Sequence, residues 1–158
     1  MTMAKTPSVG EAAPDFELEG TDGPFRLSDH LGEVVVLLFY PADNSPVCTR
    51  QFCSYRDDAA SLDSLDATLV GISGQDLASH REFMARNRLT LPLLADSDHA
   101  VARAYDAFGG PMRTTKRAVI VIDEHGIVRH RHDHRLGLDY QSAQELAAAV
   151  AGLGERAR

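Results

Sequence analysis

The sequence predicts a single α/β domain built on a mixed β-sheet with helices on both faces. Short apolar segments rich in β-branched residues recur along the chain, and segments with helical periodicity lie between them. Strands that alternate with helices are typical of a mostly parallel sheet covered on both sides. The chain has 158 residues, 44% hydrophobic and 25% charged, which is enough for one domain over residues 1–158 with a core at about 8–153.

Four segments have the composition of buried strands. They are residues 34–40 (VVVLLFY), 67–73 (ATLVGIS), 118–123 (AVIVID) and 127–130 (IVRH). The first three are almost entirely apolar, as strands buried on both faces usually are. The sequence DEHG at 123–126 has the residues of a tight turn, so we expect the last two strands to pair antiparallel and the sheet to be mixed.

Helical patterns fill the intervals between the strands. They cover residues 47–62, 76–87, 98–108 and 139–153. The last pattern has apolar residues at helical spacing along one face. The second places His80 and Arg81 on its exposed face, and neither is assigned a role. Near the N-terminus, residues 16–30 predict a short hairpin followed by a turn of helix capped by Ser28.

The charge of the chain excludes several classes of partner. A formal net charge of −7 gives no basic surface for nucleic acid or for an anionic membrane. No segment approaches the roughly 18 apolar residues that a membrane span needs, and the first residues lack the apolar core of a signal peptide. We therefore expect a cytoplasmic protein that binds neither nucleic acid nor membranes, as a monomer or a weak homodimer.

Both cysteines of the chain lie in the sequence YPADNSPVCTRQFC at 40–53. In a reducing compartment two cysteines indicate a redox or metal site more than a permanent disulfide, although both could also be small buried apolar residues. Cys48 falls in the first turn of a predicted helix, after a polar loop bracketed by Pro41 and Pro46. Free N–H groups and the positive end of the helix dipole favour an anion there, and a thiolate is such an anion.

The spacing of Cys48 and Cys53 indicates two successive roles. In a continuous helix, residues five apart are turned by about 140° and their Cα atoms lie about 8–9 Å apart. A disulfide needs Cα atoms closer than about 7 Å, so the two sulfurs cannot bond while the helix is intact. The spacing also differs from the C-x-x-C of dithiol exchange and of zinc sites. We interpret one sulfur as the attacking group and the other as the resolving group.

These residues resemble the peroxiredoxins, and within them the bacterioferritin comigratory protein subfamily, also called peroxiredoxin Q. Pro41, Ser45 and Cys48 stand at the spacing of the family signature, and Cys53 stands where the subfamily has its resolving cysteine. Arg117 precedes a late strand, as the active-site arginine of the family does. The resemblance extends over most of the chain, through residues 9–18, 34–57, 70–96 and 117–128.

The resemblance implies a thioredoxin-like fold and a thiol peroxidase. The Cys48 thiolate would attack the O–O bond of hydrogen peroxide or of an organic hydroperoxide and become a sulfenic acid. Ser45 and the backbone N–H groups of Val47 and Cys48 would hold the peroxide oxygens. Arg117 would stabilise the thiolate and the departing oxygen, while Pro41 would shield the sulfur from water.

The resemblance also implies how the cycle closes. Cys53 would attack the sulfenic acid after the helix loosens, and the resulting disulfide would be reduced by thioredoxin or a glutaredoxin-like protein. No metal or organic cofactor is required. Two alternatives stay open: an external thiol that replaces Cys53, and a non-enzymatic redox sensor in which oxidation of Cys48 changes the binding of a partner.

Four residues depart from the usual pattern of the family. Ser45 replaces threonine and keeps the hydroxyl, while Val47 replaces glycine and Asn44 replaces an aromatic residue, so the mouth of the pocket differs in shape. Gln51 replaces a glutamate that would pair with an arginine, which removes one negative charge.

A separate motif, RHRHDHR, spans residues 129–135. In an extended strand His130, His132 and His134 share one face, and such a set can bind Zn²⁺ or Ni²⁺. A solvated strand end is the simpler interpretation, because charged residues alternate with the histidines.

Overall fold

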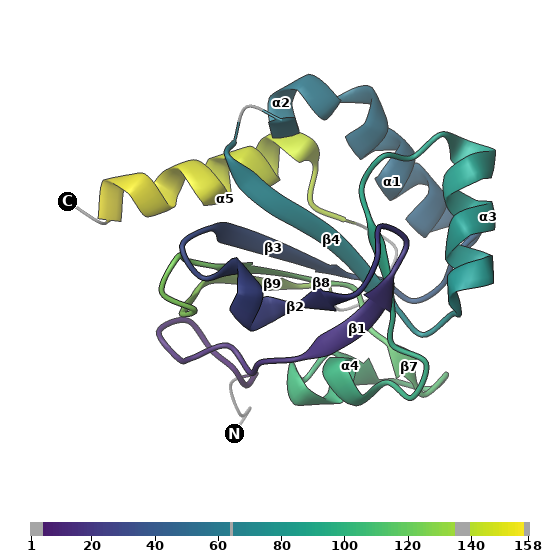
Figure 1. Cartoon of the computed structure of the whole chain (residues 1–158), viewed down its shortest axis with the longest axis horizontal. Coiled ribbons are helices and arrows are strands. Elements are labelled where there is room, and N and C mark those ends of the chain that lie inside the picture. Colours follow the sequence, from purple (N-terminus) through teal and green to yellow (C-terminus); the bar gives the residue numbers. More distant parts are fainter. Residues whose placement is uncertain (1–4, 64, 135–139, 157–158) are drawn as a thin grey trace.

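The fold is known from a computed structural model that describes residues 5–63, 65–134 and 140–156. A seven-stranded sheet runs through the molecule in the order β2-β1-β5-β4-β3-β8-β9, and helices cover both of its faces (Figure 1). The strands are β1 (Glu17–Gly20), β2 (Phe25–Arg26), β3 (Val34–Phe39), β4 (Ala67–Ser73), β5 (Leu93–Ala95), β8 (Ala118–Ile122) and β9 (Val128–Asp133), with β6 (Phe108–Gly109) and β7 (Thr114–Thr115) as a separate hairpin. The helices are α1 (Pro46–Asp57), α2 (Ala59–Asp63), α3 (Leu77–Asn87), α4 (Ala100–Ala104) and α5 (Ala143–Arg156), with a short 3-10 helix at Leu27–His30.

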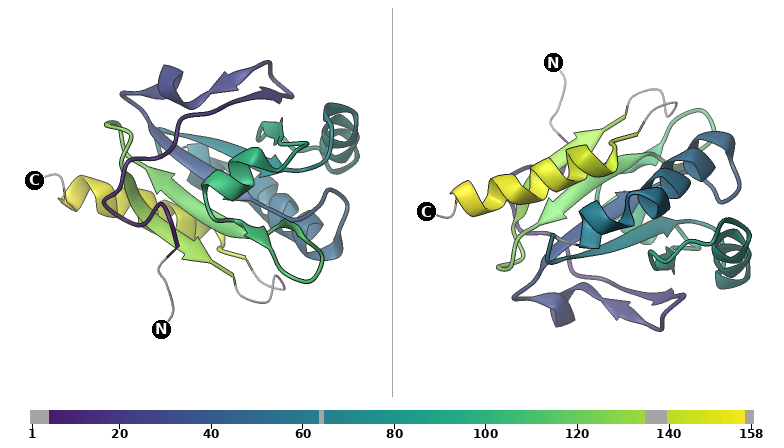
Figure 2. Two further views of the ribbon diagram at one scale, coloured as in Figure 1. Left: turned by 90° about the horizontal axis from the view of Figure 1, so that it is seen from below. Right: turned by 90° about the horizontal axis from the view of Figure 1, so that it is seen from above.

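Strand β3 is central to the sheet and to the core. It pairs in parallel with β4 and antiparallel with β8, so the mixed α/β sheet that the sequence predicts is confirmed. Val35, Leu37 and Phe39 pack into a core layer shared with α4, and the alternate residues of β3 pack into a second layer shared with α1, α2 and α5. Figure 2 shows α1, α2 and α5 over one face of the sheet and α4 over the other.

Three predicted helices have different bounds in the structure. The first is divided at Asp58, whose N–H group bonds the Ser54 carbonyl oxygen as the C-cap of α1. The third ends at Ala104, because Tyr105 is its C-cap and Asp106 adopts a left-handed φ of 52°; the chain then continues into the β6–β7 hairpin. The predicted start of the last helix, Asp139, lies outside the described residues.

Helix α5 begins with a capping box. The Ser142 hydroxyl accepts a hydrogen bond from the Glu145 N–H at 3.1 Å, and the Glu145 carboxylate accepts one from the Ser142 N–H at 3.3 Å. These two bonds satisfy donors that the helix cannot satisfy itself. The cap therefore explains why the helix begins at Ala143.

Two predictions about single side chains were wrong. Ser28 does not cap the 3-10 helix with its hydroxyl; instead, its N–H donates to Asp15 Oδ1 at 2.9 Å. His80 is not exposed but fully buried, because α3 turns this side chain toward β5 and its Nε2 bonds the Leu94 carbonyl oxygen at 2.9 Å. Arg81, its neighbour on α3, is exposed as expected.

The predicted hairpins at both ends of the sheet are confirmed. β1 pairs antiparallel with β2, and β8 pairs antiparallel with β9. In the turn between β8 and β9, Gly126 has a φ of 80° and its N–H bonds the Asp123 carbonyl oxygen at 3.0 Å. Asp123 organises this turn: its carboxylate accepts hydrogen bonds from the N–H groups of His125 and Ile127 and from the Arg129 side chain.

The Asp123 carboxylate predicts a pH-dependent contribution to stability. Burial opposes its ionisation, but the bonds from Arg129, Ile127 and His125 lower the pKa of Asp123 below its ordinary value. A carboxyl whose pKa is lowered on folding stabilises the protein above its unfolded pKa, and this stabilisation is lost as the pH falls through the folded pKa. Asp123→Asn is expected to reduce the free energy of unfolding by about 1 kcal/mol at pH 7, measured by urea denaturation. The difference between variant and wild type should begin to shrink as the pH falls below about 4 and should vanish only below the lowered pKa of the folded state; a difference that stays constant with pH would contradict this role.

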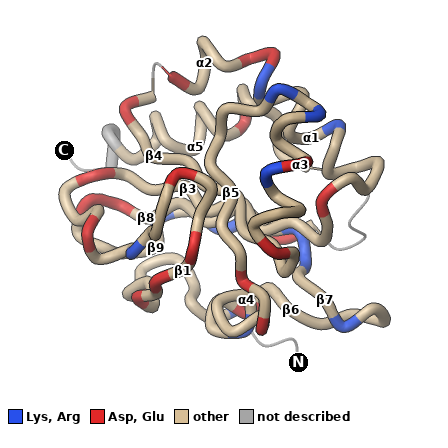
Figure 3. The backbone as a smooth tube through the Cα atoms, turned by 45° about the vertical axis from the view of Figure 1, so that its right-hand side comes forward, with Lys and Arg blue, Asp and Glu red and all other residues tan. Residues whose placement is uncertain are grey.

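The described helices and the distribution of charge can be compared with the expectations about membranes and polyanions. Within the described residues, the helices are all too short or too polar to cross a bilayer. In the view of Figure 3, acidic and basic positions are interspersed around the outside of the fold, with basic residues on α1 and α3 among acidic neighbours.

Candidate active site at the start of helix α1

The site is formed where β3 ends and α1 begins. Residues 40–45 form the loop that follows the carboxyl end of β3. Ser45 is the N-cap of α1 with φ −71° and ψ 149°, and Pro46 occupies the first helical position. Cys48 lies in the first turn, as the sequence predicts. In the described part of the chain, the N–H groups of Val47 and Cys48 donate to no other group of the protein. These free donors and the helix dipole give the sulfur an electropositive setting.

The antiparallel pairing of β3 with β8 brings Arg117 to Cys48. Phe39 lies opposite Ala118 in the register, so Arg117 comes next to the point where the chain leaves β3. Its Nη2 lies 3.0 Å from Cys48 Sγ, and only 2% of the Arg117 surface is exposed. A buried guanidinium at this distance stabilises a negative charge on the sulfur far more than an exposed one, because little water screens it.

A chain of buried side chains holds Arg117. Its Nη1 donates to Gln51 Oε1, and Gln51 Nε2 donates to the Tyr55 hydroxyl at 3.0 Å. The Tyr55 hydroxyl in turn donates to the Gln141 carbonyl oxygen at 2.6 Å. Burial raises the pKa of Tyr55 far above its ordinary value, so the hydroxyl keeps its proton and remains a donor.

The hydrogen bonds from Arg117 to Gln141 show the effect of having Gln51 in place of a glutamate. Gln51 is neutral, so it orients the guanidinium without offsetting its positive charge, which remains available to the Cys48 sulfur. The sequence analysis missed Tyr55 and Gln141. The i, i+4 spacing of Gln51 and Tyr55 on one helix was the available signal for the first.

The Ser45 hydroxyl and the Cys48 sulfur are not directly open to a substrate in this structure. The Ser45 hydroxyl donates to the Ala42 carbonyl oxygen at 3.0 Å, so it has to rotate before it can donate to a substrate. Cys48 has 0% of its surface exposed, and Pro41 and Val47 beside it are half-buried. A small oxidant therefore reaches the sulfur only when residues of the loop 41–45 or of the first turn move aside.

Cys53 lies on the same unbroken helix, five residues after Cys48. Both are free cysteines. Cys48 is buried in the core layer below α1, whereas Cys53 is half-buried with its Sγ 3.6 Å from Asn87 Oδ1 of α3. The two side chains thus point to different neighbours, and the helix separates them as its geometry requires.

Two of the β9 histidines lie on the same face of the sheet as Cys48, because His130 and His132 pair with Val121 and Val119, which pack into the layer that holds Cys48. The rings of His132 and His134 are 4.3 Å apart, and His130 Nε2 lies 3.3 Å from Gln141 Oε1. In the described ranges, no three histidine, cysteine or acidic side chains are placed to hold a metal ion together. The structure thus gives the metal-site interpretation no support.

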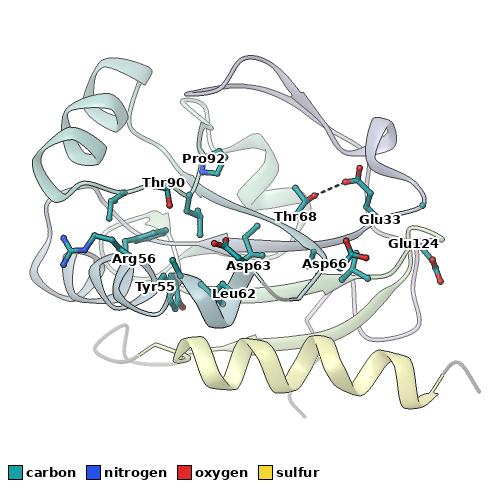
Figure 4. A pocket seen from close by; sticks show the side chains of 18 residues that line it. Glu33, Tyr55, Arg56, Leu62, Asp63, Asp66, Thr68, Thr90, Pro92 and Glu124 are labelled. Carbon is teal, nitrogen blue, oxygen red and sulfur yellow. Dashed lines mark hydrogen bonds between the residues drawn. The ribbon is translucent and has the colours of Figure 1, made fainter.

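A pocket of about 590 Å³ opens at the opposite end of α1 (Figure 4). Phe52, Tyr55 and Arg56 of α1 form one wall, and residues 89–92 before β5 form another. Cys48 and Arg117 are not among the lining residues, so this pocket is separate from the Cys48 sulfur.

The family model and the relatives that match this chain all point to one family. Residues 9–131 match the model of the AhpC/TSA family. Peroxiredoxin Bcp of Bacillus subtilis (strain 168) is 37% identical over 128 residues, which cover 77% of this chain and 82% of that protein. Chloroplastic peroxiredoxin Q of Arabidopsis thaliana is 40% identical over 126 residues, covering 76% of this chain but only 56% of that longer protein.

Solved structures agree with these matches. Peroxidoxin BcpB of Mycobacterium tuberculosis superposes with a TM-score of 0.77 at 32% identity, covering 93% of this chain and 96% of that one. The reduced 2-Cys peroxiredoxin of Plasmodium vivax superposes with a TM-score of 0.84 at 23% identity, covering 94% of this chain and 98% of that one. The superpositions confirm the thioredoxin-like fold that the sequence predicts.

Proposed function

Because the chain belongs to the AhpC/TSA family and is a peroxiredoxin, an enzyme that reduces hydroperoxides at the expense of a thiol, we propose that Cys48 is its peroxidatic cysteine and Cys53 its resolving cysteine. The observation that supports this assignment most directly is the 3.0 Å contact between Arg117 Nη2 and Cys48 Sγ. Cys53 has no comparable cation beside its sulfur among the described contacts. Of the two thiols, Cys48 is therefore the one built to react as a thiolate.

In the first step the Cys48 thiolate attacks the terminal oxygen of the hydroperoxide. The S–O bond forms as the O–O bond breaks, the sulfur becomes a sulfenic acid, and the departing oxygen leaves as water or an alcohol after taking up a proton. Negative charge moves from the sulfur to the departing oxygen during this step. Arg117 and the free N–H groups of Val47 and Cys48 surround the position where that charge develops, so they stabilise the transition state.

Entry of the peroxide requires movement around the sulfur. Since Cys48 has no exposed surface, the loop 41–45 shields the thiolate from bulk water between encounters. Pro41 and Ser45 are the shielding and the hydrogen-bonding residues that we assign there. Rotation of the Ser45 hydroxyl from the Ala42 carbonyl oxygen would supply a further donor to the bound peroxide.

In the second step Cys53 attacks the sulfenic acid, which releases water and forms a disulfide. The two residues share one helix, and their Cα atoms are too far apart to be bridged while it is intact. The first turns of α1 must therefore unwind before the disulfide forms. A dithiol reductant such as thioredoxin or a glutaredoxin-like protein then restores the two thiols.

The variant Cys53→Ser tests the resolving assignment. Its single-turnover reaction with one equivalent of hydrogen peroxide is expected at the wild-type rate, because Cys48 and Arg117 are unchanged. Steady-state peroxide consumption with thioredoxin, thioredoxin reductase and NADPH should fall by about 100-fold or more, because resolution by a distant thiol lacks the effective concentration of an intramolecular one.

Dithiothreitol in place of thioredoxin provides the control. A small thiol can resolve the sulfenic acid directly, so the variant should recover turnover with it. Unchanged turnover of Cys53→Ser with thioredoxin alone would show instead that an external thiol resolves Cys48 in the wild type too.

A further inference from the structure

A pair of ionisable side chains is buried beneath the loop that leads to Cys48, and the steps described above do not use it. Asp43, in the loop 41–45, and His80, on α3, have side chains that are 1% and 0% exposed. Asp43 Oδ2 lies 2.7 Å from His80 Nδ1. Two ionisable groups are seldom fully buried unless they are paired, because removing both from water is costly.

Each polar side-chain atom of the pair has a hydrogen-bond partner. His80 Nε2 lies 2.9 Å from the Leu94 carbonyl oxygen, which can only accept, so Nε2 carries a hydrogen. His80 Nδ1 faces Asp43 Oδ2, while the carboxylate already accepts hydrogen bonds from the Tyr40 hydroxyl at 2.7 Å and the Ser79 hydroxyl at 2.8 Å. Asp43 thus faces three side chains, and this arrangement suits a carboxylate.

The acidity of Asp43 agrees with this assignment. Burial acts to raise its pKa, but the hydrogen bonds from His80 and Tyr40, the charge on His80 and the bond from Ser79 together lower the pKa of Asp43 below its ordinary value. Arg86 of α3 lies further out, where its Nη1 contacts Asn44 Oδ1 at 3.5 Å.

The pair fixes the middle of the loop to the body of the protein. Asp43 is bound to α3 through His80 and Ser79 and to the end of β3 through Tyr40, and its N–H donates to Gln75 Oε1 at 3.0 Å. Two residues later the chain reaches Ser45, the N-cap of α1. The direction in which the first turn of α1 presents its free N–H groups therefore depends on where Asp43 is held.

We propose that Asp43 and His80 are positioning residues that hold the loop 41–45 so that Ser45 and the N–H groups of Val47 and Cys48 are aligned with the bound peroxide. This role rests on Cys48 as the peroxidatic cysteine. Misplacement of donors by about 1 Å costs about 100-fold in rate. Attack on a simple alkylating agent needs no such donors, because iodoacetamide has no oxygen that must leave with a negative charge.

Two substitutions at Asp43 separate position from charge. Asp43→Asn removes the charge but keeps the contact: its amide can donate to the Nδ1 of a neutral His80, whose Nε2 still donates to the Leu94 carbonyl oxygen. Asp43→Ala removes the carboxylate that contacts the side chains of Tyr40, Ser79 and His80. Asp123→Asn lies in the turn after β8, at the end of the strands opposite to Cys48, and is the control for a general loss of stability.

The readout is the second-order rate constant of reduced enzyme with hydrogen peroxide, from single-turnover competition against a haem peroxidase, compared with alkylation of Cys48 by iodoacetamide. For Asp43→Ala we expect about a 30- to 100-fold loss with peroxide and less than about a threefold change in alkylation. For Asp43→Asn and Asp123→Asn we expect peroxide rate constants within about fivefold and twofold of wild type. If Asp43→Ala does not fold, as judged by circular dichroism, His80→Gln takes its place, with the same split expected.

Three results would overturn the proposal: a wild-type peroxide rate in Asp43→Ala, equal losses in the alanine and asparagine variants, or parallel losses with peroxide and iodoacetamide. Failure of the underlying function is distinguishable, because the wild-type protein would then not consume peroxide through Cys48 at all.

Discussion

Cys48→Ser is expected to lower the rate constant for peroxide reduction by roughly four orders of magnitude or more. A serine hydroxyl is a far weaker nucleophile and cannot form a sulfenic acid, so neither the first step nor the disulfide is possible. The measurement is peroxide consumption in the presence of thioredoxin, its reductase and NADPH. Dimedone labelling with mass spectrometry should detect a sulfenic acid at residue 48 of the wild type and none in the variant.

The control for Cys48→Ser is the matched change at the other cysteine. Cys53→Ser should still consume one equivalent of peroxide and should accumulate the dimedone adduct at Cys48. If instead Cys48→Ser retained rapid single-turnover consumption, Cys53 would have to be the nucleophile. The arrangement of Arg117 against Cys48 would then have no catalytic meaning.

Arg117→Met is expected to lower the peroxide rate constant by about 100- to 1000-fold, the usual loss when one donor to a developing negative charge is removed. Methionine is unbranched and flexible, so it can fill much of the space that the arginine stem occupies in this buried site. The loss has two origins: the Cys48 sulfur loses the cation 3.0 Å away, and the departing oxygen loses a donor. Stopped-flow measurement of the reduced protein with hydrogen peroxide provides the rate constant.

Arg117→Lys is the companion variant. Lysine keeps the charge but has a single nitrogen, so it cannot contact Cys48 Sγ and Gln51 Oε1 together as the two terminal nitrogens of arginine do. We expect it to recover only part of the rate. A lysine variant as slow as the methionine variant would mean that the forked geometry matters more than the charge, and full activity in Arg117→Met would exclude Arg117 from the reaction.

The central sheet was predictable because its strands are buried on both faces. Residues 34–40, 67–73 and 118–123 are almost entirely apolar, and a segment of this kind has few alternatives to a central strand. β5 is different: it has three residues, Leu93–Ala95, and it exists because β4 and β1 pair with it from both sides. Such a short strand has no periodicity of its own to detect.

The helices show why the spacing of apolar residues did not predict where each helix ends. The apolar spacing continues past Asp58 into α2, yet the chain bends there, because helix ends depend on caps and tertiary contacts that the spacing does not contain. His80 shows the same limit. Its polarity suggested an exposed face, and only the fold reveals Asp43 and the Leu94 carbonyl oxygen as partners inside the core.

The residues of the candidate site were predictable, but the side chains that hold Arg117 in place were not. The motif resemblance supplied Pro41, Ser45, Cys48 and Arg117, and the antiparallel register of β3 and β8 accounts for the approach of the last two. Tyr55 and Gln141, which hold the orientation of Arg117 through Gln51, were not predictable, because one of their bonds joins a side chain to a backbone oxygen 86 positions away.

If Cys53 resolves Cys48 as proposed, the placement of both cysteines on helix α1 makes each catalytic cycle include a local unfolding and refolding of that helix. Under the proposed assignment, the lifetime of the sulfenic acid is set by how readily the first turns unwind. Substitutions that stiffen α1 would lengthen that lifetime and give a second peroxide more time to carry the sulfur on to the sulfinic acid, which a dithiol cannot reduce. A more rigid helix would therefore yield an enzyme that inactivates itself sooner under heavy oxidant load.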